Sequence, residues 1–360
     1  MNTEALIVGG GPAGAACACL LAQAGAPHLL LERSRETGDA LCGGFLSWRT
    51  VDRLTALGID ADALNRQRLT TVRLFARNRV ATAALPRPAL AVSRRRLDTL
   101  LLAHAAAAGA RIERGVTVRA IEGGQARTAD GALIDADTLF LASGKHDVRG
   151  LARPADARGR DPTLGLRLRL APSAALTRLL GDAIELHLFP GGYAGLCLQE
   201  DGSANLCLAV HRSRLDAAGD AAALLRTLGT ELPSLGERLA HGDTRAPVDA
   251  IANVPYGWRA LAAPPGIVRL GDQAGVIPSL AGEGMGIAIA SGMAAARRYS
   301  AGGAAAMSGW QQHFAHRLAR PIGVAGLVRR IAEGRHAPAA LALARPALIE
   351  LLARLTRVGA

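Results

Sequence analysis

The sequence predicts an α/β protein with three parts: a domain built on a parallel sheet, a second domain built on a mixed or antiparallel sheet, and a C-terminal helical tail. The apolar run at 5–8, followed by glycines and an alanine-rich segment, is typical of a β-α-β unit. Between residues 164 and 210 leucines alternate with polar residues, which indicates antiparallel strands with one covered face. The chain from Met307 onward has a helical pattern, which we expect to be broken at its three prolines, Pro321, Pro338 and Pro346.

Short apolar runs and their flanking residues define the elements of the parallel sheet. The first unit predicts a strand at 5–8, a helix from about 12 to 24 that Gly25 ends, and a strand at 28–31 that leads into Glu32. Residues 94–108 predict a further helix, because their leucines lie near one face. The remaining predicted elements are strands at 111–118, 138–142 and 268–271, and a helix that ends near Tyr299.

The composition is that of a globular protein with a strong basic bias. Half of the 360 residues are apolar, and the formal net charge is +12, with 41 arginines and a single lysine, Lys145, among the 42 basic residues. The arginines are scattered and accompany no nucleic-acid-binding motif, so we expect no nucleic-acid partner. The charge favours attraction to an anionic cofactor or to a membrane surface.

The five cysteines are odd in number and include no Cys-x-x-Cys pair, so we expect no zinc, iron–sulfur or other metal site. Their free thiols fit a reducing compartment. We expect no signal peptide and no transmembrane segment, because glycines and charges interrupt every apolar run before it reaches spanning length. The sequence therefore predicts a cytoplasmic protein.

A dinucleotide-binding fingerprint lies between the first strand and the first helix. In Gly9-Gly10-Gly11-Pro12-Ala13-Gly14, Gly9 permits a tight turn, Gly11 lets the backbone approach a diphosphate, and Gly14 lets helix and strand pack closely. The helix N-terminus offers free N–H groups to the phosphates. Glu32, 18 positions after Gly14 and followed by Arg33, ends the second strand, where a carboxylate accepts ribose hydroxyls. An acidic residue there argues against a 2′-phosphate.

Later motifs resemble those of the flavoprotein superfamily of aromatic-ring hydroxylases, geranylgeranyl reductases and flavin-dependent halogenases. The resemblance covers most of residues 1–300. After the fingerprint it rests on Arg94-Arg95-Arg96-Leu97-Asp98, on residues 139–144 and on Gly271-Asp272-Gln273-Ala274-Gly275-Val276-Ile277-Pro278 with Gly282-Glu283-Gly284-Met285-Gly286. It implies a Rossmann-like domain of the glutathione-reductase type that binds FAD non-covalently, formed by 1–45, 90–150 and 265–300. Segments 46–89 and 151–264 would then form the substrate domain, and 301–360 the C-terminal helices.

The resemblance places these motifs around the cofactor. Asp272 would hold a ribityl hydroxyl, and the helix that starts near Gly284 would direct its N-terminus at the flavin edge where reduced flavin carries negative charge. The fingerprint residues, Glu32 and Arg33 are expected to contact the cofactor. The resemblance adds further expected contacts, namely Cys42, Gly43, Arg94, Val118, Ser143, Gly144, Gly271, Asp272, Gly282, Gly284 and Met285.

Two further segments suggest the substrate side of the site. Cys42-Gly43-Gly44 resembles a segment of geranylgeranyl-reductase-like proteins near the flavin ring, which makes Cys42 a catalytic candidate beside Pro278 and Gly284 of the later motif. Cys42 is equally well explained as a packed thiol. Phe189 and Tyr193 flank a Pro-Gly-Gly segment and are expected to line the substrate pocket; a hairpin turn without substrate contact is the alternative.

The chain departs from the hydroxylase pattern at two positions. Ser143 stands where aromatic hydroxylases have an aspartate before the glycine, and Gly275 stands where many have histidine. The Trp-x-Trp-x-Ile-Pro signature of halogenases is absent. Lys145, next to Gly144, either pairs with a cofactor phosphate or an anionic substrate, or is an ordinary surface lysine.

Three functions follow as hypotheses. The first is a flavin monooxygenase that uses FAD, O2 and a donor such as NAD(P)H to hydroxylate an aromatic, polyketide-like or other lipophilic substrate. The second is a flavin-dependent C=C reductase of the geranylgeranyl-reductase type, and the third is a non-catalytic FAD-binding assembly factor. The sequence favours the first narrowly, on the breadth of that class.

The C-terminal segment 346–358 is amphipathic, with Arg354 and Arg357 beside its leucines, which are Leu348, Leu351, Leu352 and Leu355. We expect this stripe either to pack over the substrate domain or to form an interfacial helix that contacts the inner membrane face.

Overall fold

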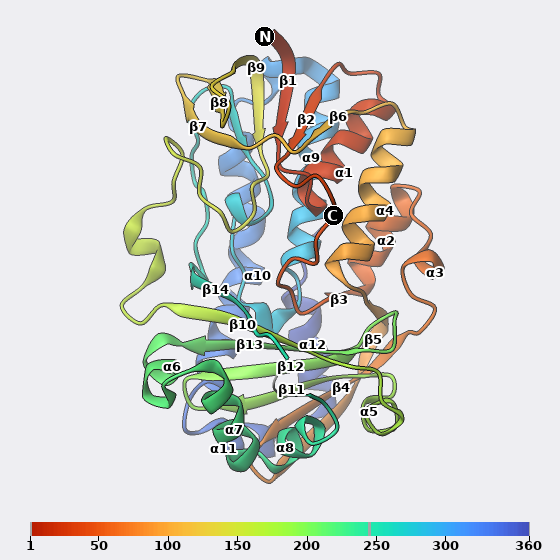
Figure 1. Cartoon of the computed structure of the whole chain (residues 1–360), viewed down its shortest axis with the longest axis vertical. Helices are drawn as coiled ribbons and strands as arrows, with labels where there is room; N and C mark the ends of the chain where they lie inside the picture. Colours follow the sequence, from red (N-terminus) through yellow and green to blue (C-terminus); the bar gives the residue numbers. More distant parts are fainter. Residues whose placement is uncertain (1, 244–245, 360) are drawn as a thin grey trace.

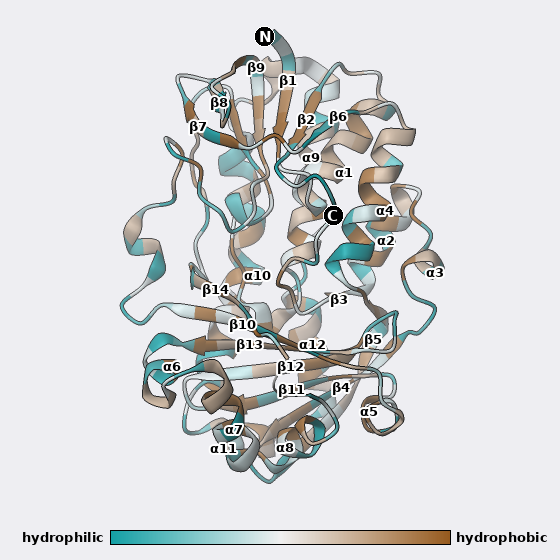
Figure 2. Ribbon diagram, in the orientation of Figure 1, coloured by the Kyte–Doolittle hydropathy of each residue, from teal (hydrophilic) through white to brown (hydrophobic). Residues whose placement is uncertain are grey.

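The structure, a computed structural model, describes residues 2–243 and 246–359 and contains two β-sheets (Figure 1). A seven-stranded sheet occupies the upper half of the view and an eight-stranded sheet the lower half. Figure 2 shows hydrophobic residues along the strands. The α/β architecture predicted from the sequence is confirmed.

The upper sheet is a parallel sheet extended by an antiparallel hairpin. Its strands run in the order β6, β2, β1, β9, β8, β7, and β15 also pairs with β9. Their bounds are β1 Asn2–Val8, β2 Leu29–Glu32, β6 Arg111–Arg114, β7 Val118–Glu122, β8 Gln125–Thr128, β9 Leu133–Leu141 and β15 Ile267–Arg269. The prediction of one strand over 111–118 was wrong, because Gly115 takes φ +78° and separates β6 from β7.

Helix α1 (Pro12–Gln23) contacts β1 and packs against both α4 (Arg94–Ala107) and α9 (Gly284–Ala306). All three helices contribute to the core that includes Ile7 and Phe140 of the upper sheet. The predicted helices 12–24 and 94–108 are thereby confirmed. Helices α1 and α9 approach so closely that a Cβ at Gly292 would lie 2.2 Å from the carbonyl oxygen of Ala13. This contact places the third turn of α9 against the first turn of α1.

The lower sheet runs in the order β14, β10, β13, β12, β11, β4, β5, β3, with antiparallel pairs except the parallel pair β11–β4. The bounds are β3 Phe45–Leu46, β4 Leu69–Ala76, β5 Arg79–Ala91, β10 Thr163–Leu170, β11 Ala183–Phe189, β12 Gly192–Leu198, β13 Ala204–His211 and β14 Asp249–Val254. Leu164, Leu166, Leu168 and Leu170 are all buried on one face, as their period of two predicts.

The two faces of the lower sheet have different neighbours. The leucine face packs with α5 (Ala174–Leu180), α7 (Ala221–Glu231) and α8 (Pro233–Leu239), and α6 (Arg212–Ala218) follows β13. The opposite face carries α11 (Ala337–Leu343) and α12 (Pro346–Leu355). This second face is the one that meets the cofactor motifs.

Helix α10 (Trp310–Ala332) runs through Pro321, so the predicted break at this residue was wrong. Leu318 and Ile322 on either side of it are buried in the main core. Their packing offsets the roughly 3 kcal/mol that a proline costs inside a helix.

The segment 46–89 divides between the two sheets. Its helices, α2 (Trp48–Ala56) and α3 (Ala61–Leu64), bury Leu54 and Leu64 in the core of the upper sheet. Its strands, β4 and β5, belong to the lower sheet.

Candidate functional site

The glycine turn between β1 and α1 has two tight positions and one open position. A Cβ at Gly9, whose φ is +108°, would lie 2.5 Å from the oxygen of Ala142, and a Cβ at Gly14 would lie 1.9 Å from the oxygen of Gly9. At Gly11 the only atom within 4 Å is a guanidinium nitrogen of Arg94, at 3.3 Å. Helix α1 begins directly after Gly11 without a side-chain cap, so its first N–H groups are available to an anion.

Glu32 is held in place by the backbone. One carboxylate oxygen accepts from the N–H of Gly10 at 2.7 Å, and the other accepts from the N–H of Ser34 at 2.8 Å. Each oxygen keeps a second lone pair, which suits the two hydroxyls of a ribose. Arg33 lies 3.0 Å from Nε2 of His146 and joins the ends of β2 and β9, while Val118 begins β7.

Arg94 is a cation with a 16% exposed side chain that faces the glycine turn. Its Nε and Nη2 donate to the two carboxylate oxygens of Asp98 at 2.9 and 2.6 Å. Burial lowers the pKa of Arg94, but the charge of Asp98 outweighs it and raises the pKa. The ion pair therefore gives α4 a fixed positive group near Gly11.

The motif at residues 271–278 brings Asp272 close to the glycine turn between β1 and α1. Gly271 takes φ +57° and a Cβ there would lie 3.2 Å from Cβ of Ala13. Asp272 follows it in the short 3-10 helix η2 (Gly271–Gln273), with its carboxylate 3.4 Å from Nζ of Lys145. The charge of Asp272 raises the pKa of Lys145, so the ammonium is protonated at neutral pH.

The N-terminus of α9 is bordered by a buried carboxylate. Gly284 starts the helix, and no atom lies within 4 Å of a Cβ built there. Glu283 is fully buried and accepts from Ser47 at 2.9 Å and from Arg357 at 2.6 Å. Gly282 takes an αL conformation and Met285 is buried. No sequence pattern indicates that Arg357 is the partner of Glu283.

The Cys42 loop is tied to the lower sheet. The oxygen of Cys42 accepts from Asn205 Nδ2 and from Cys207 Sγ, both at 3.0 Å. Asp39, earlier in this loop, accepts from Arg167 at 3.0 Å. Cys42 itself is half-buried, and a Cβ at Gly43 would meet nothing within 4 Å. The loop therefore presents an open backbone position between the two sheets.

Three hydroxyl groups meet where the lower sheet reaches Pro278. Ser279 Oγ lies 2.6 Å from Tyr256 Oη and also forms a hydrogen bond with Tyr193 Oη. Tyr193 is almost fully buried, and burial raises its pKa. We call Tyr193, Tyr256 and Ser279 the hydroxyl cluster. Sequence reasoning identified Tyr193 and the adjacent Pro278 but missed Tyr256 and Ser279.

The structure separates Phe189 from Tyr193, so the two do not line one pocket as predicted. Phe189 is packed in the leucine core toward α5, α7 and α8. Tyr193 points to the opposite face with Leu188, Ala209 and Leu341. The reason is the pleat: Leu188 pairs with Tyr193 in the β11–β12 register, so Phe189 faces the other way.

Comparison with known proteins identifies the cofactor. Residues 2–147 match the family model of the FAD binding domain. The chain is an FAD-dependent oxidoreductase. It is 27% identical over 347 residues to the menaquinone reductase of Mycolicibacterium smegmatis, covering 88% of this chain and 82% of that protein. It is 26% identical over 321 residues to digeranylgeranylglycerophospholipid reductase 2 of Methanopyrus kandleri, covering 81% and 75%.

The fold likeness extends over nearly the whole oxidoreductase. The structure of PqsL, a probable FAD-dependent monooxygenase from Pseudomonas aeruginosa, superposes with a TM-score of 0.73, covering 96% of this chain and 100% of that chain at 17% identity. The predicted FAD-binding fold with a second sheet domain is thereby confirmed.

The residues of the oxidoreductase fit FAD. Gly11, Gly43 and Gly284 each leave open space where a side chain would otherwise stand. Glu32 supplies acceptors for a ribose, and the uncapped start of α1 supplies donors for a diphosphate.

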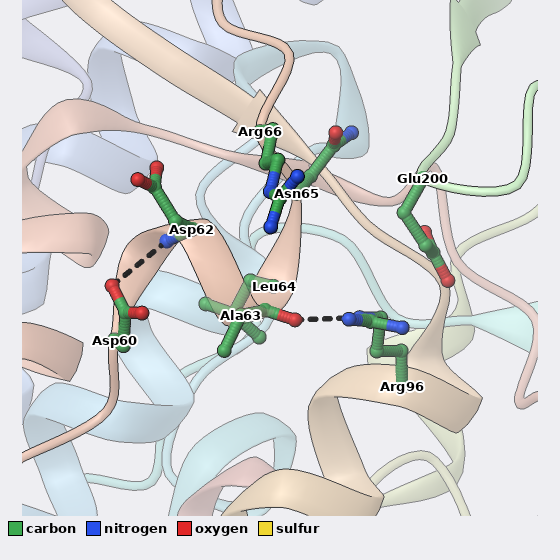
Figure 3. Close-up of a pocket in the computed structure, with 8 residues that line it drawn as sticks. All are labelled: Asp60, Asp62, Ala63, Leu64, Asn65, Arg66, Arg96 and Glu200. Atoms are coloured by element: carbon green, nitrogen blue, oxygen red, sulfur yellow. Dashed lines mark hydrogen bonds between the residues drawn. The ribbon is translucent and has the colours of Figure 1, made fainter.

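A separate surface pocket of about 500 Å³ lies between α3 and the start of α4 (Figure 3). It is lined by Asp60, Asp62, Ala63, Leu64, Asn65, Arg66, Arg96 and Glu200. Its polar groups are engaged locally, since Asp60 accepts from the N–H of Asp62 and Arg96 donates to the oxygen of Ala63. None of the predicted cofactor contacts lines it, so we assign it no part in the site.

No helix of the described residues is long and apolar enough to cross a membrane. Among the same residues no group of three or more His, Cys, Asp or Glu side chains is arranged to hold a metal ion.

Proposed function

We propose that this oxidoreductase is a flavin monooxygenase that hydroxylates a lipophilic substrate carrying a phenolic or carbonyl oxygen, with NAD(P)H as the electron donor. Bound FAD supplies the redox chemistry, and the protein binds, orients and shields the reactants. The proposed cofactor contacts are those predicted from the motifs, namely Gly9, Gly11, Pro12, Ala13, Gly14, Glu32, Arg33, Cys42, Gly43, Arg94, Val118, Ser143, Gly144, Gly271, Asp272, Gly282, Gly284 and Met285.

The hydroxyl cluster is the observation that carries this proposal. Both tyrosine hydroxyls lie within hydrogen-bond distance of Ser279 Oγ, which has a single proton to donate. When the tyrosines donate to Ser279, the serine proton is free for another acceptor. Ser279 is exposed and directly follows Pro278 of the cofactor motif, so that acceptor is best supplied by an oxygen of the substrate.

The surroundings of the cluster suit a lipophilic molecule. Tyr193 packs with Leu188, Ala209 and Leu341, and Leu280 lies against the same group. An apolar site with a few fixed polar groups binds a hydrophobic body and orients its polar end. This combination favours an aromatic or polyketide-like substrate over a hydrocarbon chain without oxygen.

The proposal is tested by measuring whether an oxygen atom from O2 enters the product. Purified protein reconstituted with FAD is given NADH or NADPH, a long-chain alkylresorcinol and 18O2, and the product mass is measured. Gain of one 18O atom, reduced in the Ser279→Ala variant, is the expected result. A product that gains two hydrogens and no oxygen would overturn the monooxygenase proposal, and an absence of turnover with every donor would support a non-catalytic FAD-binding role.

A C=C reductase is the second candidate, favoured by two specific observations. Both curated relatives are named reductases, and Cys42-Gly43-Gly44 lies in a loop fastened to the substrate sheet by Asn205 and Cys207. A reductase would take a prenyl chain over this open loop. Anaerobic turnover of a polyprenylated quinone, detected as two added hydrogens that stay in the prenyl chain after the ring has been re-oxidised to the quinone, would decide for it.

We further propose that the C-terminal helices contact anionic membrane surfaces. Eight large apolar side chains are exposed in the described part of the chain, and five lie on α10–α12: Leu327, Ile331, Leu343, Leu348 and Leu351. Helix α10 contacts both α11 and α12, and Arg330, Arg335 and Arg345 are exposed on or beside these helices. Apolar side chains with flanking arginines suit an anionic lipid interface, which also stores lipophilic substrates.

A further inference from the structure

We propose that Lys145, the only lysine of the chain, binds the diphosphate of FAD through its ammonium group. This contact lies outside the glycine fingerprint and depends on the FAD cofactor, not on which reaction the protein catalyses. It resolves the alternative between a cofactor ligand and an ordinary surface lysine.

The backbone around Lys145 is clamped. Gln273 Nε2 donates to the oxygens of Gly144 and His146 at 2.9 and 3.0 Å. Arg153 donates to the oxygen of Lys145 itself at 2.5 Å. Both clamping residues are buried: Gln273 is 0% exposed and Arg153 is 7% exposed. A solvated surface lysine needs no such support, whereas a ligand must be held at a defined position.

The clamped turn lies against the glycine fingerprint. A Cβ at Gly9 would come within 3.3 Å of Cα of Ser143, two residues before Lys145. Gly271 packs against Ala13 of the same fingerprint, and Asp272 is the next residue in the chain. Lys145 and Asp272 therefore stand beside the helix N-terminus that is built to receive phosphates.

The ammonium group of Lys145 has N–H donors that its contact with Asp272 does not use, in contrast to the committed guanidinium of Arg94. Arg94 is committed to Asp98 by two short hydrogen bonds. Lys145 meets Asp272 at 3.4 Å, longer than a good charge-assisted hydrogen bond, and an ammonium group has three N–H donors. Burial of this group is opposed by the charge of Asp272, which keeps the pKa of Lys145 raised and the ammonium charged.

The choice of lysine fits this role. A chain with 41 arginines and one lysine has a strong bias toward arginine at any basic position. Arginine is a wide, planar fork, whereas lysine is a compact point charge that approaches a phosphate within a narrow space.

The first test compares cofactors with and without the diphosphate. Apo-protein is titrated with FAD and with riboflavin, and the dissociation constants are read from flavin fluorescence. We expect Lys145→Gln to weaken FAD binding about tenfold or more and to leave riboflavin binding within about twofold, since only the charged contact is lost. Lys145→Arg should recover part of the FAD affinity. Arg149→Gln, at an 83%-exposed arginine four residues after Lys145, is the matched control and should bind FAD normally.

The second test uses the single lysine as its own reporter. Acetylation by an amine-specific reagent is followed by mass spectrometry at Lys145, with the N-terminal amine as an internal reference. We expect FAD and ADP to protect Lys145 and adenosine to leave it reactive. Unchanged FAD affinity in Lys145→Gln, equal losses for FAD and riboflavin, or equal labelling with and without ADP would overturn the proposal. Thermal melting of each apo-variant separates these outcomes from misfolding.

Discussion

Arg357, three residues from the C-terminus, forms an ion pair of 2.6 Å with Glu283 at the start of α9. The same guanidinium donates to the oxygen of Ala281 at 2.6 Å, and the N–H of Val358 donates to Glu283 at 3.3 Å. The pair is almost fully buried, with 5% of the Arg357 side chain and none of the Glu283 side chain exposed. The end of the chain therefore neutralises a buried charge inside the cofactor motif.

Replacing Arg357 should destabilise the protein strongly. In Arg357→Met the carboxylate of Glu283 loses its closest cation and stays buried, and breaking such a pair costs about 3–5 kcal/mol. Urea unfolding followed by circular dichroism measures the loss. FAD affinity should fall with it, because Glu283 adjoins the helix N-terminus at Gly284.

Two variants control for this effect. Arg354→Met removes an arginine that is 56% exposed and paired with Glu350 on the surface, so it should change stability by less than about 0.5 kcal/mol. The double variant Glu283→Gln with Arg357→Met should recover part of the lost stability, because no buried charge remains uncompensated. Equal stabilities of Arg357→Met and Arg354→Met would contradict the role assigned to the pair.

Gly11→Val should abolish FAD binding and leave the apo-fold intact. A Cβ at Gly11 meets only the guanidinium of Arg94 at 3.3 Å, which is the movable end of a side chain, but it occupies the space proposed for the diphosphate. Flavin absorbance of the purified protein and its apo melting temperature are the two measurements.

Gly14→Ala is the contrasting variant, because its Cβ would lie 1.9 Å from a backbone oxygen. It should damage the fold itself. Full flavin content in Gly11→Val would show that the fingerprint is only a turn.

Local patterns predicted the parts of the fold that depend on local backbone. The glycine turn, the helix starts at Pro12 and Arg94 and the alternating leucines of β10 all follow from neighbouring residues. The FAD cofactor followed from motifs whose glycines are required by close contacts, as at Gly9. These features need no knowledge of the rest of the chain.

Long-range pairs were beyond the reach of the sequence. Glu283 and Arg357 are 74 residues apart, and one arginine among 41 carries no signal of its partner. Phe189 and Tyr193 are four residues apart but lie across a glycine turn, and only the strand register decides which face each occupies. The hydroxyl cluster draws on three separate segments, so Tyr256 was missed for the same reason.

Acid should destabilise the protein in part through His187, on the leucine face of the lower sheet. The ring is fully buried, stacks on Phe75 at 4.5 Å and contacts Glu185 at 3.2 Å, with Arg238 and Arg73 on the same carboxylate. Burial lowers the pKa of His187 below 6.5. The unfolded chain then binds the proton more readily than the folded chain, so this contribution is complete above pH 6.5 and is lost as the pH falls through the folded pKa.

His187→Gln should flatten the pH dependence of stability. Between about pH 7.5 and pH 5.5, a single such histidine adds a slope of at most about 1.4 kcal/mol per pH unit. Melting temperatures over this range should therefore fall less steeply in the variant than in the parent protein. Parallel curves would show that His187 does not titrate between the two states.

Membrane contact should depend on the leucines that α12 leaves exposed. Helix α12 packs through Ile349 against Val72 and Ala83, whereas Leu348 and Leu351 are 46% and 49% exposed, so these two leucines of the stripe do not pack over the lower sheet. Removing the tail after Arg345 would also remove Arg357, and loss of binding would then report only unfolding. The double variant Leu348→Gln with Leu351→Gln avoids this problem, because both side chains lie outside the core.

We expect the parent protein to sediment with phosphatidylglycerol vesicles at low salt and the double variant to bind about tenfold more weakly, with unchanged melting temperature and flavin content. Val80→Gln, at an exposed residue of β5, is the matched control and should bind normally. A parent protein that ignores these vesicles at low salt, where electrostatic attraction is strongest, would disprove the membrane proposal.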